Sequence, residues 1–241
     1  LNGIPKLEYL RPLDVQGRCL PIAAVDASSN LIGYSGGRAY ELLRAAIVLR
    51  RGNDKVRLIK LGPFITRSSS ERGSFLFELE TMAQRLAARR IKNGIVLFDG
   101  TALESLDSEF PLVTIPSTNS FISLSKVMPT QSLDGEGRMP KGPFIAKVEE
   151  GDSFLVRLST DGFILRAMAS TKDADETTWL FSCLTRSDSI EMGYPRAMKL
   201  AHIYSKILPM DIISARLALF EKHNIKARDP IDGRKLLLGC M

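Results

Sequence analysis

The chain of 241 residues is 44% hydrophobic and 25% charged, which is enough apolar material to bury one substantial core. Lysine and arginine outnumber aspartate and glutamate by 33 to 27, and the resulting net charge of +6 fits a polyanionic partner. Three widely spaced cysteines without a CxxC pair exclude a disulfide framework and a zinc knuckle, and no apolar run reaches the ~18 residues of a membrane span. We therefore expect a single cytoplasmic domain over residues 1–241, without membrane contact.

The first clear structural signal is an apolar run that stops at a carboxylate. Residues 1–19 mix proline, glycine and polar residues, which predicts an irregular lead-in. Residues 20–25 then predict a buried strand that ends at Asp26, and the following Ala-Ser-Ser-Asn is typical of a turn. An aspartate at a strand end, with hydroxyl groups behind it and no basic neighbour in sequence, suits metal ligation better than a surface salt bridge.

Extended segments follow this strand. Residues 31–51 predict two strands separated by Gly36-Gly37, although the Leu, Ala and Glu content of residues 40–51 also fits a helix. Residues 56–64 predict another short strand with a Gly-Pro stop. We expect three or four antiparallel strands after the strand that ends at Asp26.

The strongest predicted helix is SFLFELETMAQRLAARRI, residues 74–91, because its apolar residues recur at helical spacing. It contains two acidic candidates, Glu78 and Glu80, which lie on nearly opposite helix faces, so only one of them can reach a site at a sheet edge. Its basic residues favour a solvated helix face over a track for DNA. They are Arg85, Arg89, Arg90 and Lys92.

A second apolar strand, residues 94–99, again ends at an aspartate, Asp99. The order of a carboxylate-ending strand, antiparallel strands, a glutamate-bearing helix and a second carboxylate-ending strand is the layout of ribonuclease H-like folds. Parallel pairing of the two strands would place Asp26 and Asp99 at one sheet edge, with the helix glutamate over them. We predict an α/β fold with a ribonuclease H-like mixed central sheet flanked by helices.

The second half of the chain predicts shorter elements. Strands are expected at residues 111–116 and 119–126, an exposed loop at residues 129–144, and a hairpin over residues 154–169. Residues 171–179 predict a polar connection. Two helices complete the prediction: one from Tyr194 that tolerates Pro195 in its first turn and is closed by Pro209, and a final one over residues 211–224.

Five segments, taken in chain order, resemble the NurA family of DNA-end-processing nucleases: AAVDASSN, ELETMAQRL, GIVLFDGTALES, FISLSK and, above all, GYPRAMKLAH. The resemblance implies a ribonuclease H-like fold, a homodimer and manganese-dependent cleavage of DNA, of the single-strand endonuclease and 5'-3' exonuclease type. It also implies action beside a HerA-type hexameric ATPase in resecting double-strand breaks. Ala27 departs from the family pattern, which usually has glycine after the first aspartate.

The resemblance carries over onto four residues directly. Asp26 and Asp99 match the aspartates of the first and fourth strands, and Tyr194 and His202 match the tyrosine and histidine of the C-terminal helix. Eight positions separate Tyr194 from His202, slightly more than two helical turns, so both can point toward the same side of the sheet edge. A lone histidine on a helix is otherwise most often a packing residue.

The implied chemistry is metal-dependent hydrolysis of a phosphodiester. For the helix glutamate, Glu78 is preferred because ELE aligns most naturally with its first acid, and Glu80 is the alternative. With Asp26 and Asp99, this glutamate would hold one or two Mn²⁺ or Mg²⁺ ions, one of which lowers the pKa of the attacking water. His202 would bind or position the second ion, or serve the leaving oxygen.

Two residues are candidate contacts to the substrate. Tyr194 would hydrogen-bond a phosphate or order the water. Lys126 is by default a solvated surface lysine, but it would meet the scissile phosphate if the strand that it ends lies beside the first strand. Trp179 and the other aromatic residues are too scattered to predict a base-stacking platform.

Two other classes of function stay open on the sequence. A catalytically silent ribonuclease H-like module would scaffold DNA or a motor ATPase without turnover. An actin-like phosphotransferase would need a second half with its own glycine-rich phosphate turn, which the sequence does not contain. We expect the surface for a protein partner to be an exposed apolar edge near one of the termini.

Overall fold

The computed structural model of the protein describes residues 7–14, 18–51, 56–67, 74–99, 118–125, 140–149, 152–171 and 173–228. Within these residues, nine strands form one mixed sheet in the order β1-β7-β8-β9-β6-β5-β2-β3-β4. The strands are β1 (Leu7–Pro12), β2 (Ile22–Ser35), β3 (Arg38–Arg50), β4 (Arg57–Arg67), β5 (Ile95–Asp99), β6 (Ser120–Ser125), β7 (Phe144–Val148), β8 (Phe154–Arg157) and β9 (Ile164–Ala169). The helices are α1 (Ser74–Arg90), α3 (Ala174–Ser187), α4 (Arg196–Ser205) and α5 (Pro209–His223), and a small separate hairpin pairs β10 (Ile190–Glu191) with β11 (Tyr194–Pro195).

The two strands that carry the candidate aspartates are parallel neighbours, as the sequence predicts, but only β5 ends at its aspartate. β2 continues past Asp26 to Ser35, so the predicted strand end at Asp26 and the turn expected at residues 27–30 are wrong, because these residues pair with β3. Val25 of β2 lies opposite Phe98 of β5, so that Asp26 and Asp99 follow at the same level of the sheet. The strands β2, β3 and β4 pair antiparallel, which is also predicted. A parallel pair requires a crossover connection, and α1 lies in the crossover between β4 and β5.

Helices cover both faces of the central strands. Val25 and Phe98 pack in the core under α1, whereas Ala24 and Leu97 pack in the core under α3 and α4. Strands that are buried on both faces are apolar throughout, which is why β5 shows no alternation of apolar and polar residues. The predicted fold class, an α/β fold with a mixed central sheet flanked by helices, is confirmed. In the described ranges, no helix has both the length and the apolar character to cross a bilayer.

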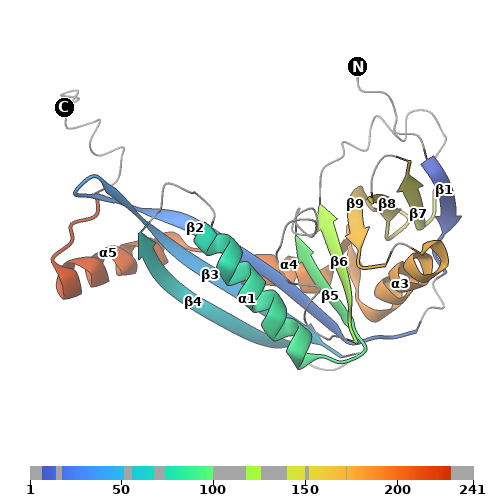
Figure 1. The fold of residues 1–241 in the computed structure, drawn as a ribbon, viewed down its shortest axis with the longest axis horizontal. Helices are drawn as coiled ribbons and strands as arrows, with labels where there is room; N and C mark the ends of the chain where they lie inside the picture. The colour runs from blue at the N-terminus through green and yellow to red at the C-terminus, as the bar shows by residue number, and fades with distance from the viewer. Residues whose placement is uncertain are drawn as a thin grey trace, which may run out of the picture.

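The sheet extends much further on one side than on the other (Figure 1). β5 ends at Asp99, whereas β2 continues to Ser35 and is paired with β3 over most of its length. The strands β2, β3 and β4 therefore form an arm that projects past the end of β5. Helix α5 packs on this arm through Ala215 and Leu219.

Some predicted boundaries are wrong. Residues Leu7–Pro12 of the expected irregular lead-in form the edge strand β1, where Pro12 is tolerated because it is the last residue. Phe144, the last residue of the expected exposed loop 129–144, is buried at the start of β7. Residues 129–139 of that loop and the predicted strand 111–116 lie outside the described residues.

Two further differences concern helices. Residues 40–50, whose composition also fits a helix, belong to β3, because Ala45, Ala46, Ile47 and Val48 are buried on both sides of the sheet. The predicted polar connection 171–179 instead leads into α3 at Ala174. The Asp173 carboxylate caps this helix by accepting a hydrogen bond from the Glu176 amide at 2.8 Å.

Candidate metal centre

Three side chains from three elements converge where β5 ends. Asp26 of β2, Asp99 of β5 and His202 of α4 each offer one ligand atom, and these atoms all lie within 4.8 Å of one another. Asp26 is buried, while Asp99 and His202 are partly exposed, so the group is accessible from one side. Two carboxylate oxygens and an imidazole nitrogen form a donor set that suits Mn²⁺, and the hard oxygens also suit Mg²⁺.

The Asp26 carboxylate is held from α4 by two residues. His202 Nδ1 lies 3.2 Å from Asp26 Oδ2, and the buried Ser205 hydroxyl donates a hydrogen bond to the same oxygen. Ser205 is a functional candidate that the sequence analysis missed. The available signal was its position three residues after His202, which places both residues on one helix face.

Tyr194 lies beside the two aspartates, but not where the sequence predicts. It belongs to β11, and α4 begins only at Arg196, so the predicted helical relationship between Tyr194 and His202 is wrong. Burial, the charges of Asp99 and Asp26, and a side-chain hydrogen bond with Asp99 all raise the pKa of Tyr194. The phenol therefore keeps its proton at neutral pH and can act as a hydrogen-bond donor.

The helix acid that faces the aspartates is Glu80. Burial, together with the charges of Asp26 and Asp99, raises the pKa of Glu80 to about 7, while a hydrogen bond from Gln84 opposes this shift. Glu78 is exposed on another face of α1. Leu79, which lies between the two glutamates in sequence, is buried. The sequence-based preference for Glu78 over Glu80 therefore does not fit the structure, since the motif ELE carries no information on how α1 is rotated against the sheet.

The C-terminal end of α4 is fastened to the arm. Arg44 of β3 forms a two-pronged ion pair with Asp211, at 2.8 and 3.0 Å, and also donates to the Lys206 carbonyl at 2.9 Å. Ser28 of β2 donates its hydroxyl hydrogen to the Ser205 carbonyl. These contacts position Ser205, and with it the Asp26 carboxylate, relative to β2.

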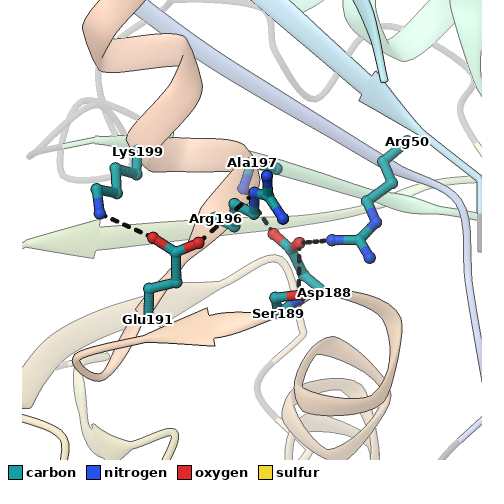
Figure 2. A network of polar contacts seen from close by, with 7 residues as sticks. All are labelled: Arg50, Asp188, Ser189, Glu191, Arg196, Ala197 and Lys199. Carbon is teal, nitrogen blue, oxygen red and sulfur yellow. Dashed lines mark hydrogen bonds and ion pairs between the residues drawn. The ribbon is translucent and has the colours of Figure 1, made fainter. Parts of the chain in front are cut away.

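The N-terminal end of α4 is held by a residue from outside the helix. Pro195 at the N-cap has no side-chain hydrogen bond to offer, and the buried carboxylate of Asp188 instead accepts hydrogen bonds from the amides of Ala197 and Ser189 and pairs with Arg50. Figure 2 shows this network and its connection to β3 through Arg50. Burial raises the pKa of Asp188, although the Ala197 amide and Arg50 favour its charged form.

The fold was compared with solved structures and with known families. The NurA nuclease from Sulfolobus solfataricus is similar with a TM-score of 0.54 and 14% identity, over 89% of this chain and 88% of that chain. A NurA structure bound to dAMP and manganese is similar with a TM-score of 0.61 and 12% identity, over 88% of this chain and 90% of that chain. The chain has the NurA nuclease fold. In this NurA-like fold, Asp26 and Asp99 lie on adjacent parallel strands, as the sequence resemblance implies. No protein-family model and no curated protein matches the sequence.

One predicted site residue cannot be placed. Lys126 follows the last residue of β6 and lies outside the described residues. Its assignment as a contact to the scissile phosphate stays a prediction.

Proposed function

We propose that this protein is a metal-dependent deoxyribonuclease. The observation that supports this most strongly is the convergence of Asp26, Asp99 and His202 within 4.8 Å at the C-terminal end of β5 and the adjacent part of β2. Glu80 adds a third carboxyl group, whose pKa is raised by the charges of both aspartates. Buried like charges repel one another, so a shared cation is the simplest way to stabilise them together.

The residues that would hold the metal are Asp26, Asp99 and His202, with Glu80 as an additional ligand. Mn²⁺ is proposed as the ion, with Mg²⁺ as the alternative, and the manganese in the similar NurA structure supports this choice. A bound divalent ion lowers the pKa of a coordinated water and stabilises negative charge on phosphate oxygens. Ser205 would keep the Asp26 carboxylate in its ligating orientation, because it donates to one oxygen of that group.

Tyr194 is the proposed contact to the substrate phosphate. Its neutral phenol has a single hydrogen to donate, which would pass from Asp99 to a phosphate oxygen when the substrate binds at the aspartates. His202 is partly exposed and can also serve the leaving oxygen. These two residues and Lys126 would orient the phosphodiester while the carboxylates hold the ion.

The proposed assembly is a homodimer that works with a HerA-type hexameric ATPase in resecting DNA ends in the cytoplasm. Helix α5 supports the dimer, since one of its faces packs on the arm and the other carries an exposed apolar stripe at spacings of 3, 4 and 3 residues. Such spacing is typical of a helix that packs against another helix. The stripe consists of Met210, Ile213, Leu217 and Phe220.

Incubation of the protein with single- and double-stranded DNA in Mn²⁺, Mg²⁺ or EDTA tests the proposed activity. We expect cleavage with Mn²⁺, none with EDTA, and none with the Asp26→Asn or Asp99→Asn variants, which should still fold. Glu149→Gln, an exposed acid that follows β7 at the opposite edge of the sheet, is a matched control that should cleave normally. DNA binding without turnover in any divalent metal would instead identify a catalytically silent module.

A further inference from the structure

Two turns that are far apart in the chain touch each other beside the candidate metal centre. One joins β8 to β9 and contains Gly162, and the other joins β10 to β11 and contains Gly193. A side chain on Gly162 would place its Cβ 2.5 Å from the Gly193 Cα, and one on Gly193 would place its Cβ 2.6 Å from both the Gly162 Cα and the Phe163 amide nitrogen. Only glycine fits at either position, so the two backbones are in direct contact.

The turn between β10 and β11 is also held from its other side. Glu191 pairs with Lys199 at 2.8 Å and with Arg196 at 3.5 Å, and both of these residues belong to α4 (Figure 2). Met192 and Gly193 both have positive φ, 54° and 84°, as a tight two-residue hairpin turn requires. The turn is therefore fixed between α4 and the β8–β9 turn.

These fixed turns expose two large apolar side chains. Phe163 is 56% exposed, and Met192, at 75%, is the most exposed large hydrophobic residue in the part of the chain that the structure describes. Neither side chain contributes to a buried core cluster there. On a constrained backbone, these two exposed apolar side chains are available to contact a ligand without a large loss of backbone freedom.

The two turns that carry Phe163 and Met192 lie at the same edge of the sheet as the metal centre. Met192 is two residues from Tyr194, so their Cα atoms are at most about 7.6 Å apart, and Tyr194 lies close enough to Asp99 and Asp26 that both charges raise its pKa. Phe163 directly precedes β9, and β9 begins at the sheet edge where β5 ends, because Asp99 lies opposite Leu124 of β6 and Leu124 lies opposite Ala167 of β9. Both turns therefore lie at the sheet edge where a phosphate would bind.

We infer that Phe163 and Met192 hold an unpaired nucleobase of the DNA strand next to the scissile phosphate. This inference rests on the proposed nuclease function. An aromatic ring stacks on the face of any base, and a methionine thioether makes favourable contacts with aromatic rings. A base within a duplex has both faces covered by its neighbours, so this contact would favour single-stranded DNA or a frayed end.

Phe163→Ala tests the inference with oligonucleotides that carry one abasic site, moved stepwise along the strand. For the unchanged protein we expect one position, adjacent to the cleaved bond, where loss of the base raises KM about 5- to 100-fold. Phe163→Ala should raise KM for the intact strand by a similar factor, leave kcat nearly unchanged, and remove the penalty of the abasic site. Met192→Ala should act in the same direction but more weakly.

Phe64→Ala is the matched control, because Phe64 is 47% exposed on the edge strand β4, away from the metal centre. It should behave like the unchanged protein, and all variants should keep the same melting temperature. An abasic penalty that persists unaltered in Phe163→Ala overturns the inference.

Binding in EDTA separates this inference from the proposed function. In fluorescence anisotropy, the Asp99→Asn variant should lose affinity at the same abasic position, and the Asp99→Asn, Phe163→Ala double variant should bind the intact strand more weakly and show no loss at that position. If the protein binds in this way but never cleaves, the nuclease proposal fails and the base contact stands. If Asp99→Asn binds no single-stranded DNA, or binds it without regard to Phe163, the base contact is refuted.

Discussion

The Ser205 hydroxyl donates a hydrogen bond to Asp26 Oδ2 across 179 positions of sequence, and it reaches the same carboxylate oxygen that faces His202. This contact makes the end of α4 part of the metal centre. Ser205→Ala should therefore weaken Mn²⁺ binding by about 10- to 100-fold, because an unsupported ligand loses its orientation. Isothermal titration calorimetry measures this directly, and Ser29→Ala on the exposed arm is the control that should bind Mn²⁺ normally.

The two glutamates of α1 provide an internally matched pair of variants. Glu80→Gln should lower Mn²⁺-dependent cleavage by at least about 10- to 100-fold, because Glu80 lies with Asp26 and Asp99, whereas Glu78→Gln should leave it unchanged. Both changes replace one carboxyl group by an amide on the same helix. A larger loss of cleavage in Glu78→Gln than in Glu80→Gln would instead identify Glu78 as the metal ligand.

The raised pKa of Glu80 makes the metal-free protein less stable as pH rises. Its pKa of about 7 in the folded state exceeds the value of 4.5 for a free carboxyl group, so the folded state binds more protons between these limits. Glu80→Gln should then be more stable by about 3 kcal/mol at pH 8, and by less than about 1 kcal/mol at pH 5. Urea unfolding in EDTA at the two pH values measures the difference, and a gain that does not change with pH would contradict it.

Asp188 should be important for stability although it lies outside the metal centre. Asp188→Ala removes the acceptor for the Ala197 amide and leaves the Arg50 charge without its partner, which should cost about 3 kcal/mol of unfolding free energy. Glu191→Gln, which breaks exposed ion pairs to the same helix, should leave the unfolding midpoint unchanged. Chemical denaturation of both variants tests the contrast.

The apolar stripe of α5 should mediate self-association. Leu217→Glu places a charge in the middle of the stripe and should weaken the dimer by at least about tenfold, because burying one leucine contributes roughly 1.5–3 kcal/mol. Analytical ultracentrifugation reports the change. Lys222→Glu on the same helix, where the side chain is exposed and polar, is the control. An unchanged association constant for Leu217→Glu would remove the stripe from the interface.

Local sequence patterns were sufficient for the part of the site that depends on the sheet. An apolar run that stops at Asp26, and another that stops at Asp99, predicted two buried strands, and their order around a helix predicted the parallel pairing that the structure has. The assignment of His202 and Tyr194 to the site rested only on the family resemblance. Single histidine and tyrosine residues carry no periodic signal of their own.

The remaining parts depend on contacts between distant segments. Ser205 and Asp188 act through partners that become neighbours only after folding, and the choice between Glu80 and Glu78 depends on how α1 is rotated. Two local signals were readable but missed. Asp173 with Glu176 three residues later is a helix start, and Met192-Gly193 is a tight turn that prevents Tyr194 from being helical.

The length of β2 links assembly to metal binding. The same continuous strand carries Asp26 and then runs to Ser35 along the arm on which α5 is mounted. A partner that bends the arm would therefore shift the Asp26 carboxylate, so contacts between subunits would change the affinity for the metal ion. The monomer produced by Leu217→Glu should then show a different Mn²⁺ affinity from the dimer, and identical affinities would mean that the strand is too stiff, or the bend too small, to transmit the effect.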